Sequence, residues 1–171
     1  MTAQRPYNVL FLCTGNSARS ILAESLLNSL GQGRFRGFSA GSFPKRQVHP
    51  LALDLLKRMD LPAAGLRSKS WDEFAAPGAP PIDFIFTVCD NAAGEVCPIW
   101  PGKPLTAHWG IADPAAAEGS AADKAFAFRK ALEELETRIT RFLALPIASL
   151  DTPTLSEKLR SIGNSSAPTG A

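Results

Sequence analysis

Long apolar runs and an excess of one charge are both missing from this sequence. No stretch of about 18 consecutive apolar residues occurs, so no segment is long enough to cross a membrane as a helix. The 18 Lys and Arg against 16 Asp and Glu leave a formal net charge of +2, with the basic residues scattered. This balance argues against a nucleic acid or a membrane as partner. A small anion needs only a local site and is not excluded.

Cysteine and histidine are scarce. Residues 1–7 lack the apolar core and cleavage site of a secretory signal, so we expect a cytoplasmic protein with reduced thiols. The three cysteines are Cys13, Cys89 and Cys97. Thiols in such a protein are catalytic, metal-binding or inert. A zinc site needs about four closely spaced ligands, and the only histidines are His49 and His108, so no metal site is expected.

The length and composition are those of one folded domain. The chain has 171 residues, of which 45% are hydrophobic and 20% charged, and no internal repeat is visible. A chain of this size buries enough surface to fold without disulfides or a structural metal. We expect the domain to occupy residues 1–146. Residues 147–171, rich in Ser, Thr, Pro, Gly and Ala, are expected to form a C-terminal extension that is flexible from about Asn164.

Apolar runs with strand character alternate with helical patterns. Strands are predicted over 7–12, 34–39, 83–88 and 105–109, and helices over 19–30, 50–59 and 121–145, with a short helix at 71–74. This order predicts a single three-layer α/β domain with a four-stranded parallel sheet. We expect Ser17 to cap the first helix, Gly31 to end it and His49 to begin the second. The long third helix has a predicted apolar side made of Phe126, Leu132, Leu135, Ile139 and Phe142.

A loop suited to an anion follows the first strand. In open α/β sheets, ligands bind beyond the carboxyl ends of the strands, and this loop lies there, directly before a helix. Successive backbone N–H groups and the positive end of the helix form an anion cradle. The oxyanion-binding residues are predicted to be Thr14, Gly15, Asn16, Ser17, Ala18 and Arg19.

Cys13 begins this loop. The loop dipoles and the Arg19 guanidinium are expected to lower the pKa of its thiol, which would make it a nucleophile at neutral pH. Arg19 offers a planar fork of donors to two oxygens of a tetrahedral oxyanion. The alternative is a buried, inert Cys13 beside a surface Arg19. Cys89 follows the third strand as Cys13 follows the first, and Cys89 and Cys97 would otherwise be small buried hydrophobic residues.

Four segments carry a family resemblance over residues 7 to 145. The run VLFLCTGNSARS, residues 9–20, resembles the active-site loop of low-molecular-weight tyrosine phosphatases and of the arsenate reductases that share their fold. Residues 39–42 resemble that family's second signature, and Asp113-Pro114 resembles its general-acid loop. Residues 87–98, which contain Cys89 and Cys97, resemble the redox segment of the arsenate reductase branch.

The resemblance to the reductase branch implies a relay of three thiols. Cys13 attacks arsenate held by the loop and Arg19, while Asp113 protonates the departing oxygen. Cys89 then attacks Cys13 and releases arsenite, and Cys97 moves the disulfide to Cys89–Cys97. One dithiol becoming one disulfide supplies the two electrons that this reduction needs. No tightly bound cofactor is implied; the reductant is an external thiol, with thioredoxin favoured over glutaredoxin and glutathione, and phosphate or sulfate can mimic arsenate.

The resemblance also implies supporting roles. Ser20 and Ser39 match loop-supporting positions, and Asn16, Glu24 and Ser39 match a monovalent cation site of some relatives. Glu24 could equally be a solvated surface residue. His108 could orient the general acid or be a packed, hydrogen-bonded residue.

Three functions remain open: an arsenate reductase, a low-molecular-weight tyrosine phosphatase, and a non-catalytic redox or oxyanion sensor. The role of Asp113 is also open, because this residue could simply cap a turn. Ala115-Ala116-Ala117 follow Asp113-Pro114, where the phosphatases usually carry aromatic residues, and this departure weakens the phosphatase alternative. A low-molecular-weight tyrosine phosphatase would not need Cys89 or Cys97, and a non-catalytic redox or oxyanion sensor would bind or oxidise without turnover. Arsenate reduction for arsenic detoxification is the function that the sequence favours.

Overall fold

The protein folds around a four-stranded sheet. The computed structural model describes residues 5–89 and 102–164, and its strands lie in the order β2-β1-β3-β4 with every neighbouring pair parallel. The strands are β1 (Tyr7–Cys13), β2 (Phe35–Gly41), β3 (Phe84–Thr87) and β4 (Leu105–His108). The predicted α/β class and the four parallel strands are therefore confirmed, with strand ends shifted by one or two residues.

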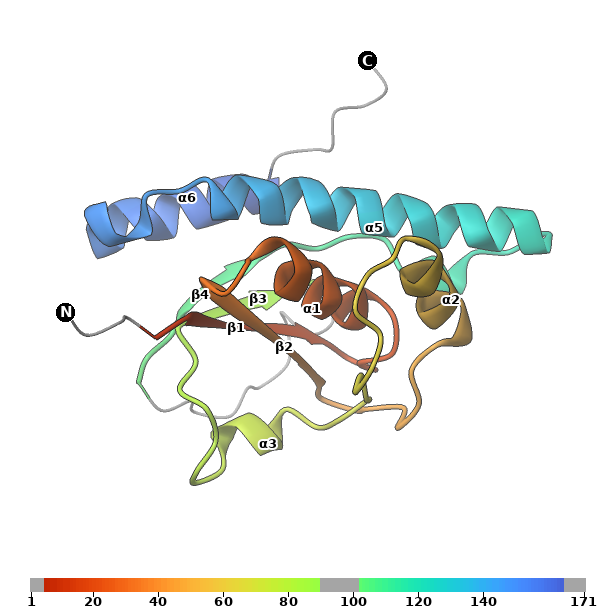
Figure 1. The fold of residues 1–171 in the computed structure, drawn as a ribbon, viewed down its shortest axis with the longest axis horizontal. Coiled ribbons are helices and arrows are strands. Elements are labelled where there is room, and N and C mark those ends of the chain that lie inside the picture. The colour runs from red at the N-terminus through yellow and green to blue at the C-terminus, as the bar shows by residue number, and fades with distance from the viewer. Residues whose placement is uncertain (1–4, 90–101, 165–171) are drawn as a thin grey trace, which may run out of the picture.

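Helices cover both faces of the sheet. The helices are α1 (Arg19–Leu30), α2 (Pro50–Arg58), α3 (Asp72–Ala75), α5 (Ala121–Leu143) and α6 (Thr152–Asn164), with 3-10 turns η1 (Pro114–Ala116) and η2 (Ile147–Ser149). Figure 1 shows α1, α5 and α6 on one face and α3 on the other. Because side chains alternate along a strand, Val9 and Phe11 pack into the larger core. Leu10 and Leu12 pack into a smaller core with Phe74 of α3. None of the described helices is long and apolar enough to cross a membrane.

Two local predictions about the helices are wrong. Ser17 does not cap α1: the N-cap residue is Ala18, and no N-cap side chain makes a capping hydrogen bond. The loop holds Ser17 in its own backbone turn, where its carbonyl accepts from the His49 amide. Phe126 is 68% exposed instead of facing the core. Phe128 of the same helix is buried, and residues two apart on a helix point about 200° apart, so burial of one exposes the other.

Other helix ends agree with the sequence. Gly31 is the C-cap of α1, and His49 is the N-cap of α2, where its Nδ1 accepts from the Leu51 amide at 3.1 Å. The remaining residues predicted for the apolar side of α5 are buried: Leu132, Leu135, Ile139 and Phe142.

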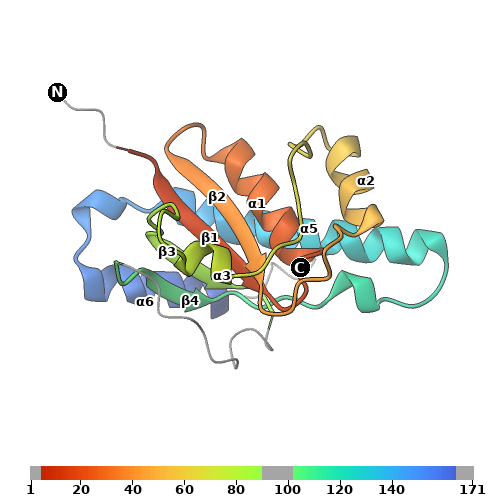
Figure 2. The same ribbon diagram turned by 90° about the horizontal axis from the view of Figure 1, so that it is seen from below.

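Helix α6, which the sequence pattern did not predict, packs against the edge strand β4 (Figure 2). Its buried face consists of Leu155, Leu159 and Ile162. The Trp109 indole, just after β4, donates to the Leu159 carbonyl at 2.9 Å. Gly163 approaches the same strand so closely that a Cβ there would lie 2.1 Å from the His108 carbonyl oxygen. The C-terminal helix is thus part of the packed structure.

Candidate active site

The carboxyl ends of β1 and β3 bring two cysteines to one edge of the sheet. Cys13 is the last residue of β1 and Cys89 follows β3. Leu12 pairs with Thr87, and the Val88 amide donates to the Leu12 carbonyl at 2.8 Å, so the two strands end side by side. Both cysteines are buried thiols. Cys97 lies outside the described residues, as does most of the predicted redox segment.

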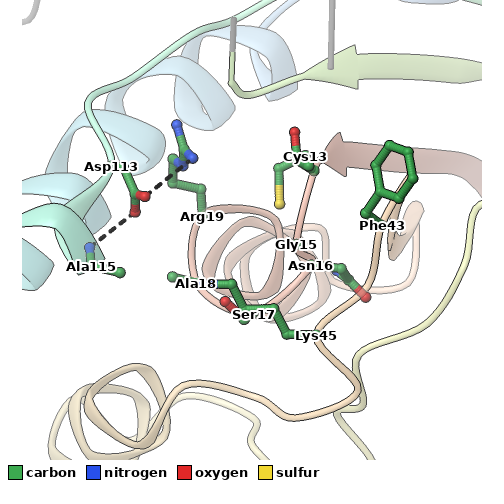
Figure 3. A pocket seen from close by; sticks show the side chains of 11 residues that line it. Cys13, Gly15, Asn16, Ser17, Ala18, Arg19, Phe43, Lys45, Asp113 and Ala115 are labelled. Atoms are coloured by element: carbon green, nitrogen blue, oxygen red, sulfur yellow. Dashed lines mark hydrogen bonds and ion pairs between the residues drawn. The ribbon is translucent and has the colours of Figure 1, made fainter. Parts of the chain in front are cut away.

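The loop between β1 and α1 encloses a polar pocket of about 200 Å³. Figure 3 shows the Cys13 sulfur facing this pocket, with Arg19 and Asp113 at one side and Phe43 at the other. Helix α1 begins at Arg19, so the positive end of its dipole points into the pocket. Backbone N–H groups at such a position bind oxyanions. The pocket is lined by residues 13–19 together with Phe43, Lys45, Asp113 and Ala115.

A chain of buried hydrogen bonds ends at the Cys13 sulfur. The Lys69 amide donates to Asn16 Oδ1 at 2.9 Å, which fixes the orientation of the Asn16 side chain. Asn16 Nδ2 must then donate to Ser20 Oγ, 2.8 Å away. Ser20 Oγ also lies 2.9 Å from Cys13 Sγ, and when Cys13 is ionised the sulfur can only accept, so the Ser20 hydroxyl is the donor. A hydroxyl that donates to sulfur stabilises the thiolate.

The net effect on Cys13 differs from the sequence expectation. Burial raises the pKa of the Cys13 thiol. Hydrogen bonds from the Ser20 hydroxyl and from the backbone amides of Ser20 and Asn16 lower this pKa, but the net shift is upward. The lowered pKa expected for Cys13 is therefore wrong. One reason is that the Arg19 guanidinium is turned elsewhere: it donates to the Ile111 carbonyl at 3.2 Å. The sequence could not reveal how completely the packing removes Cys13 from water.

Arg19 and Asp113 form an ion pair at the rim of the pocket. Arg19 Nη2 lies 3.6 Å from Asp113 Oδ2, and these side chains are 17% and 39% exposed (Figure 3). The other carboxylate oxygen of Asp113 accepts from the Ala115 amide at 2.9 Å and caps η1. Asp113 thus has the turn-capping role that the sequence left open and also faces the anion loop. A carboxyl group at this place can give a proton to an oxygen leaving the pocket.

Cys89 contacts the anion loop. Its sulfur lies 3.6 Å from Thr14 Oγ1, the first residue after Cys13. A negative charge on Cys89 raises the pKa of Cys13, because two like charges repel each other. His108 is exposed and its Nδ1 lies 2.7 Å from Thr87 Oγ1 on the adjacent strand.

Ser39, Glu24 and Asn16 lie behind the loop with an additional cation. Ser39 Oγ donates to Glu24 Oε1 at 2.5 Å, and the same oxygen is 3.7 Å from the ammonium of Lys69, a buried residue. Burial raises the pKa of Glu24 and lowers that of Lys69, while each charge partly stabilises the other. Because Lys69 already provides a cation here and Asn16 bonds to Ser20 and Lys69, these residues do not fit a resident metal ion. Within the described residues, no group of three or more His, Cys, Asp and Glu side chains could hold one.

Sequence reasoning missed Lys45, Phe43 and Lys69. Phe43 is 73% exposed at the mouth of the pocket, and Lys45 lines it. Phe43 and Lys45 come directly after residues 39–42, which resemble the second family signature. That resemblance was the only sequence signal that could have placed them near the loop. Lys69 meets Glu24 only through the tertiary fold, and no local pattern indicates this.

Comparisons with known proteins agree with this geometry. The family described as low molecular weight phosphotyrosine protein phosphatase matches residues 8–155. The chain belongs to this family. Among curated family members, it is 34% identical to the arsenate reductase of Halalkalibacterium halodurans over 134 residues, which are 78% of this chain and 93% of that protein.

Solved structures of arsenate reductases have the same phosphatase fold. The arsenate reductase of Archaeoglobus fulgidus is similar with a TM-score of 0.63 and 28% identity, covering 80% of this chain and 99% of that one. The thioredoxin-dependent arsenate reductase of Corynebacterium glutamicum is similar with a TM-score of 0.59 and 25% identity, covering 82% of this chain and 62% of that one. The family thus contains reductases that resemble this chain along most of its length.

Proposed function

We propose that this phosphatase-fold protein reduces arsenate to arsenite in arsenic detoxification, with Cys13 as the nucleophile. The observation that carries the proposal is the placement of two buried thiols, Cys13 and Cys89, at the carboxyl ends of adjacent parallel strands. Cys13 lines the oxyanion pocket, and Cys89 contacts Thr14, which also lines it. Arsenate reductases at 30–34% identity among the curated relatives support the same assignment.

The first step joins sulfur to arsenic. Arsenate binds the loop amides of residues 14–19, with two of its oxygens on the Arg19 guanidinium. The Cys13 thiolate attacks arsenic, and one oxygen leaves as water after taking a proton from Asp113. Ser20 supports this step because its hydroxyl favours the thiolate form of Cys13. The product is a Cys13 thiol ester of arsenate.

The second step transfers two electrons. The Cys89 thiolate attacks Cys13 Sγ and forms the Cys13–Cys89 disulfide. The electron pair of the broken sulfur–arsenic bond stays on arsenic, which changes from the pentavalent to the trivalent state and leaves as arsenite. The contact between Cys89 and Thr14 supports this step, since it places the second thiol against the loop that holds the first.

The third step returns the enzyme to its starting state. Cys97 attacks Cys89, so that the disulfide becomes Cys89–Cys97 and Cys13 is again a thiol. An external dithiol then reduces that disulfide and is itself oxidised. We favour a thioredoxin as this dithiol, as in the thioredoxin-dependent relative from Corynebacterium glutamicum, over a glutaredoxin with glutathione. A relay of this kind works where thiols are kept reduced, so we propose that the protein acts in the cytoplasm.

The test compares single cysteine variants in two assays. Arsenite formation from arsenate, with thioredoxin, thioredoxin reductase and NADPH, is measured for the wild type and for Cys13→Ser, Cys89→Ser and Cys97→Ser. Hydrolysis of p-nitrophenyl phosphate is measured in parallel. We expect each variant to lose multiple turnover of arsenate, and only Cys13→Ser to lose phosphate ester hydrolysis.

Other outcomes identify the alternatives. If the wild type hydrolyses the ester and makes no arsenite with thioredoxin or glutaredoxin, the protein is a phosphatase. If it binds oxyanion or forms the disulfide without turnover of either substrate, it is a sensor. Cys89→Ser in a single-turnover assay adds a further check, because it should stop arsenite release while Cys97→Ser allows one turnover.

A further inference from the structure

The segment after β2 lies along the anion loop and is fixed to it. The Phe43 amide donates to the Thr14 carbonyl, the Lys45 amide to the Gly15 carbonyl and the His49 amide to the Ser17 carbonyl, each at 2.9 Å. The backbone of residue 45 is therefore held in register with the loop that faces the anion.

The Lys45 side chain lies flat across Gly15. A Cβ placed on Gly15 would lie 3.2 Å from Lys45 Cε and 3.3 Å from its Cγ. Gly15 is thus the residue whose small size lets the lysine stem lie on the loop. Figure 3 shows Lys45 beside the loop, on the side of the pocket away from Asp113. Lys45 and Arg19 therefore bring positive charge to the pocket from two different elements.

These two cations differ in their partners. Arg19 is paired with Asp113 at 3.6 Å, so an ionised Asp113 cancels much of its charge. In the described part of the chain, no carboxylate forms an ion pair with Lys45. The charge of Lys45 also reaches the neighbouring His49, whose pKa it helps to lower. Lys45 is thus the positive side chain of this pocket whose charge stays uncompensated.

We propose that Lys45 is a specificity-determining residue of the oxyanion pocket and makes it select dianions over monoanions. The inference rests on the proposed oxyanion chemistry of this site. The Coulomb energy between Lys45 and a ligand is proportional to the charge of the ligand. Loss of Lys45 therefore changes the logarithm of the dissociation constant twice as much for a dianion as for a monoanion of the same shape.

Sulfate and perchlorate test this directly. Both are tetrahedral oxyanions of fixed charge near neutral pH, with two negative charges and one. Their dissociation constants are measured by titrating the amide NMR signals of residues 14–19 in the reduced full chain, for wild type and Lys45→Met. Because Lys45 is solvent-exposed, we expect about a twofold weaker binding of perchlorate and about a fourfold weaker binding of sulfate. Added salt of a non-binding ion should shrink both effects.

Two variants serve as controls. Lys45→Arg keeps the charge and should keep the selectivity. Arg46→Met removes the adjacent exposed cation, whose charge acts on Glu73 and which does not line the pocket, so it should leave both constants near the wild-type values. Equal factors for sulfate and perchlorate in Lys45→Met, or the same factors in Arg46→Met, would overturn the inference. So would a wild type that binds neither anion.

The proposed function is tested separately. A wild type that makes no arsenite but shows the Lys45-dependent preference for sulfate refutes the reductase and leaves the dianion selectivity in place. If the wild type makes arsenite but Lys45→Met weakens the binding of sulfate and of perchlorate by the same factor, only the selectivity is refuted.

Discussion

The hydroxyl of Ser20 is expected to control how readily Cys13 ionises. Ser20 Oγ lies 2.9 Å from Cys13 Sγ, and it is the donor to the sulfur when Cys13 is ionised, because a thiolate can only accept. A hydrogen bond to a charged group contributes about 1.5–3 kcal/mol. At 1.36 kcal/mol per pKa unit, Ser20→Ala should raise the pKa of Cys13 by about 1–2 units.

The direction of the pH dependence follows from burial. Burial already raises the pKa of Cys13 above its ordinary value, and the Ser20 bond lowers it. Removing that bond makes the thiolate rarer at any pH below the new pKa. At neutral pH the thiolate fraction should fall about 10- to 100-fold, and reactivity should recover as the pH rises.

The assay is alkylation of Cys13 by iodoacetamide across a range of pH. Cys89→Ser and Cys97→Ser are introduced in all samples, so that only Cys13 reacts. Ser25→Ala is the matched control, because Ser25 is also a buried serine of α1 but donates to the Pro62 carbonyl and does not contact Cys13. If Ser20→Ala leaves the pKa where Ser25→Ala leaves it, the orientation of the hydroxyl toward sulfur is wrong.

Three further perturbations follow from the geometry around the site. Asn16→Asp replaces the donor to the serine hydroxyl with an acceptor and adds a negative charge, so it should raise the pKa of Cys13 further than Ser20→Ala does. Lys69→Met leaves the Glu24 carboxylate without its cation; it should lower the free energy of unfolding by a few kcal/mol and make the melting temperature respond to potassium, which the wild type should not. Gly163→Ala places a methyl against β4 and should lower the free energy of unfolding in urea by about 1–3 kcal/mol, despite the better helix propensity of alanine.

Each of these perturbations has a matched control. Asn16→Asp is compared with Ser20→Ala in the same alkylation assay, and a smaller shift would contradict the deduced direction of the bond. Lys57→Met removes an exposed lysine and should leave stability and salt response unchanged; a wild type stabilised by potassium beyond the effect of sodium would refute the role of Lys69. Ser161→Ala, on the exposed side of α6, should cost less than Gly163→Ala, and equal losses would show that the close approach is unimportant.

The sheet and the anion loop could be predicted because their signals are local. A buried apolar run such as 7–12 indicates a strand by itself, and the turn residues and helix that follow Cys13 indicate an anion loop. The assignment of Ser17 as a cap failed because the same residue type serves a loop or a helix end, and only the backbone decides which. The prediction that Phe126 is buried was wrong because its spacing along the helix is only close to that of the core-facing residues.

The electrostatics of the site could not be predicted from the sequence. The pKa of Cys13 depends on the water that the whole fold excludes, and Arg19 is turned toward Ile111 and Asp113 by contacts about ninety residues away in the chain. The pairing of Lys69 with Glu24 likewise joins two elements that no local pattern connects. The sequence therefore reveals where the anion loop lies, whereas long-range packing determines the pKa of its cysteine and the orientation of its arginine.

The bond from Trp109 to Leu159 has a consequence for the order in which the protein becomes functional during synthesis. The anion loop and its nucleophile precede helix α6 in the chain and are translated before it. The strand that leads into Asp113 packs against α6, whose residues are translated later than both the anion loop and Asp113. A nascent chain can therefore form the oxyanion cradle well before its acid is held in place. Premature termination before residue 152 would yield a chain with the nucleophile but without the support of its acid loop.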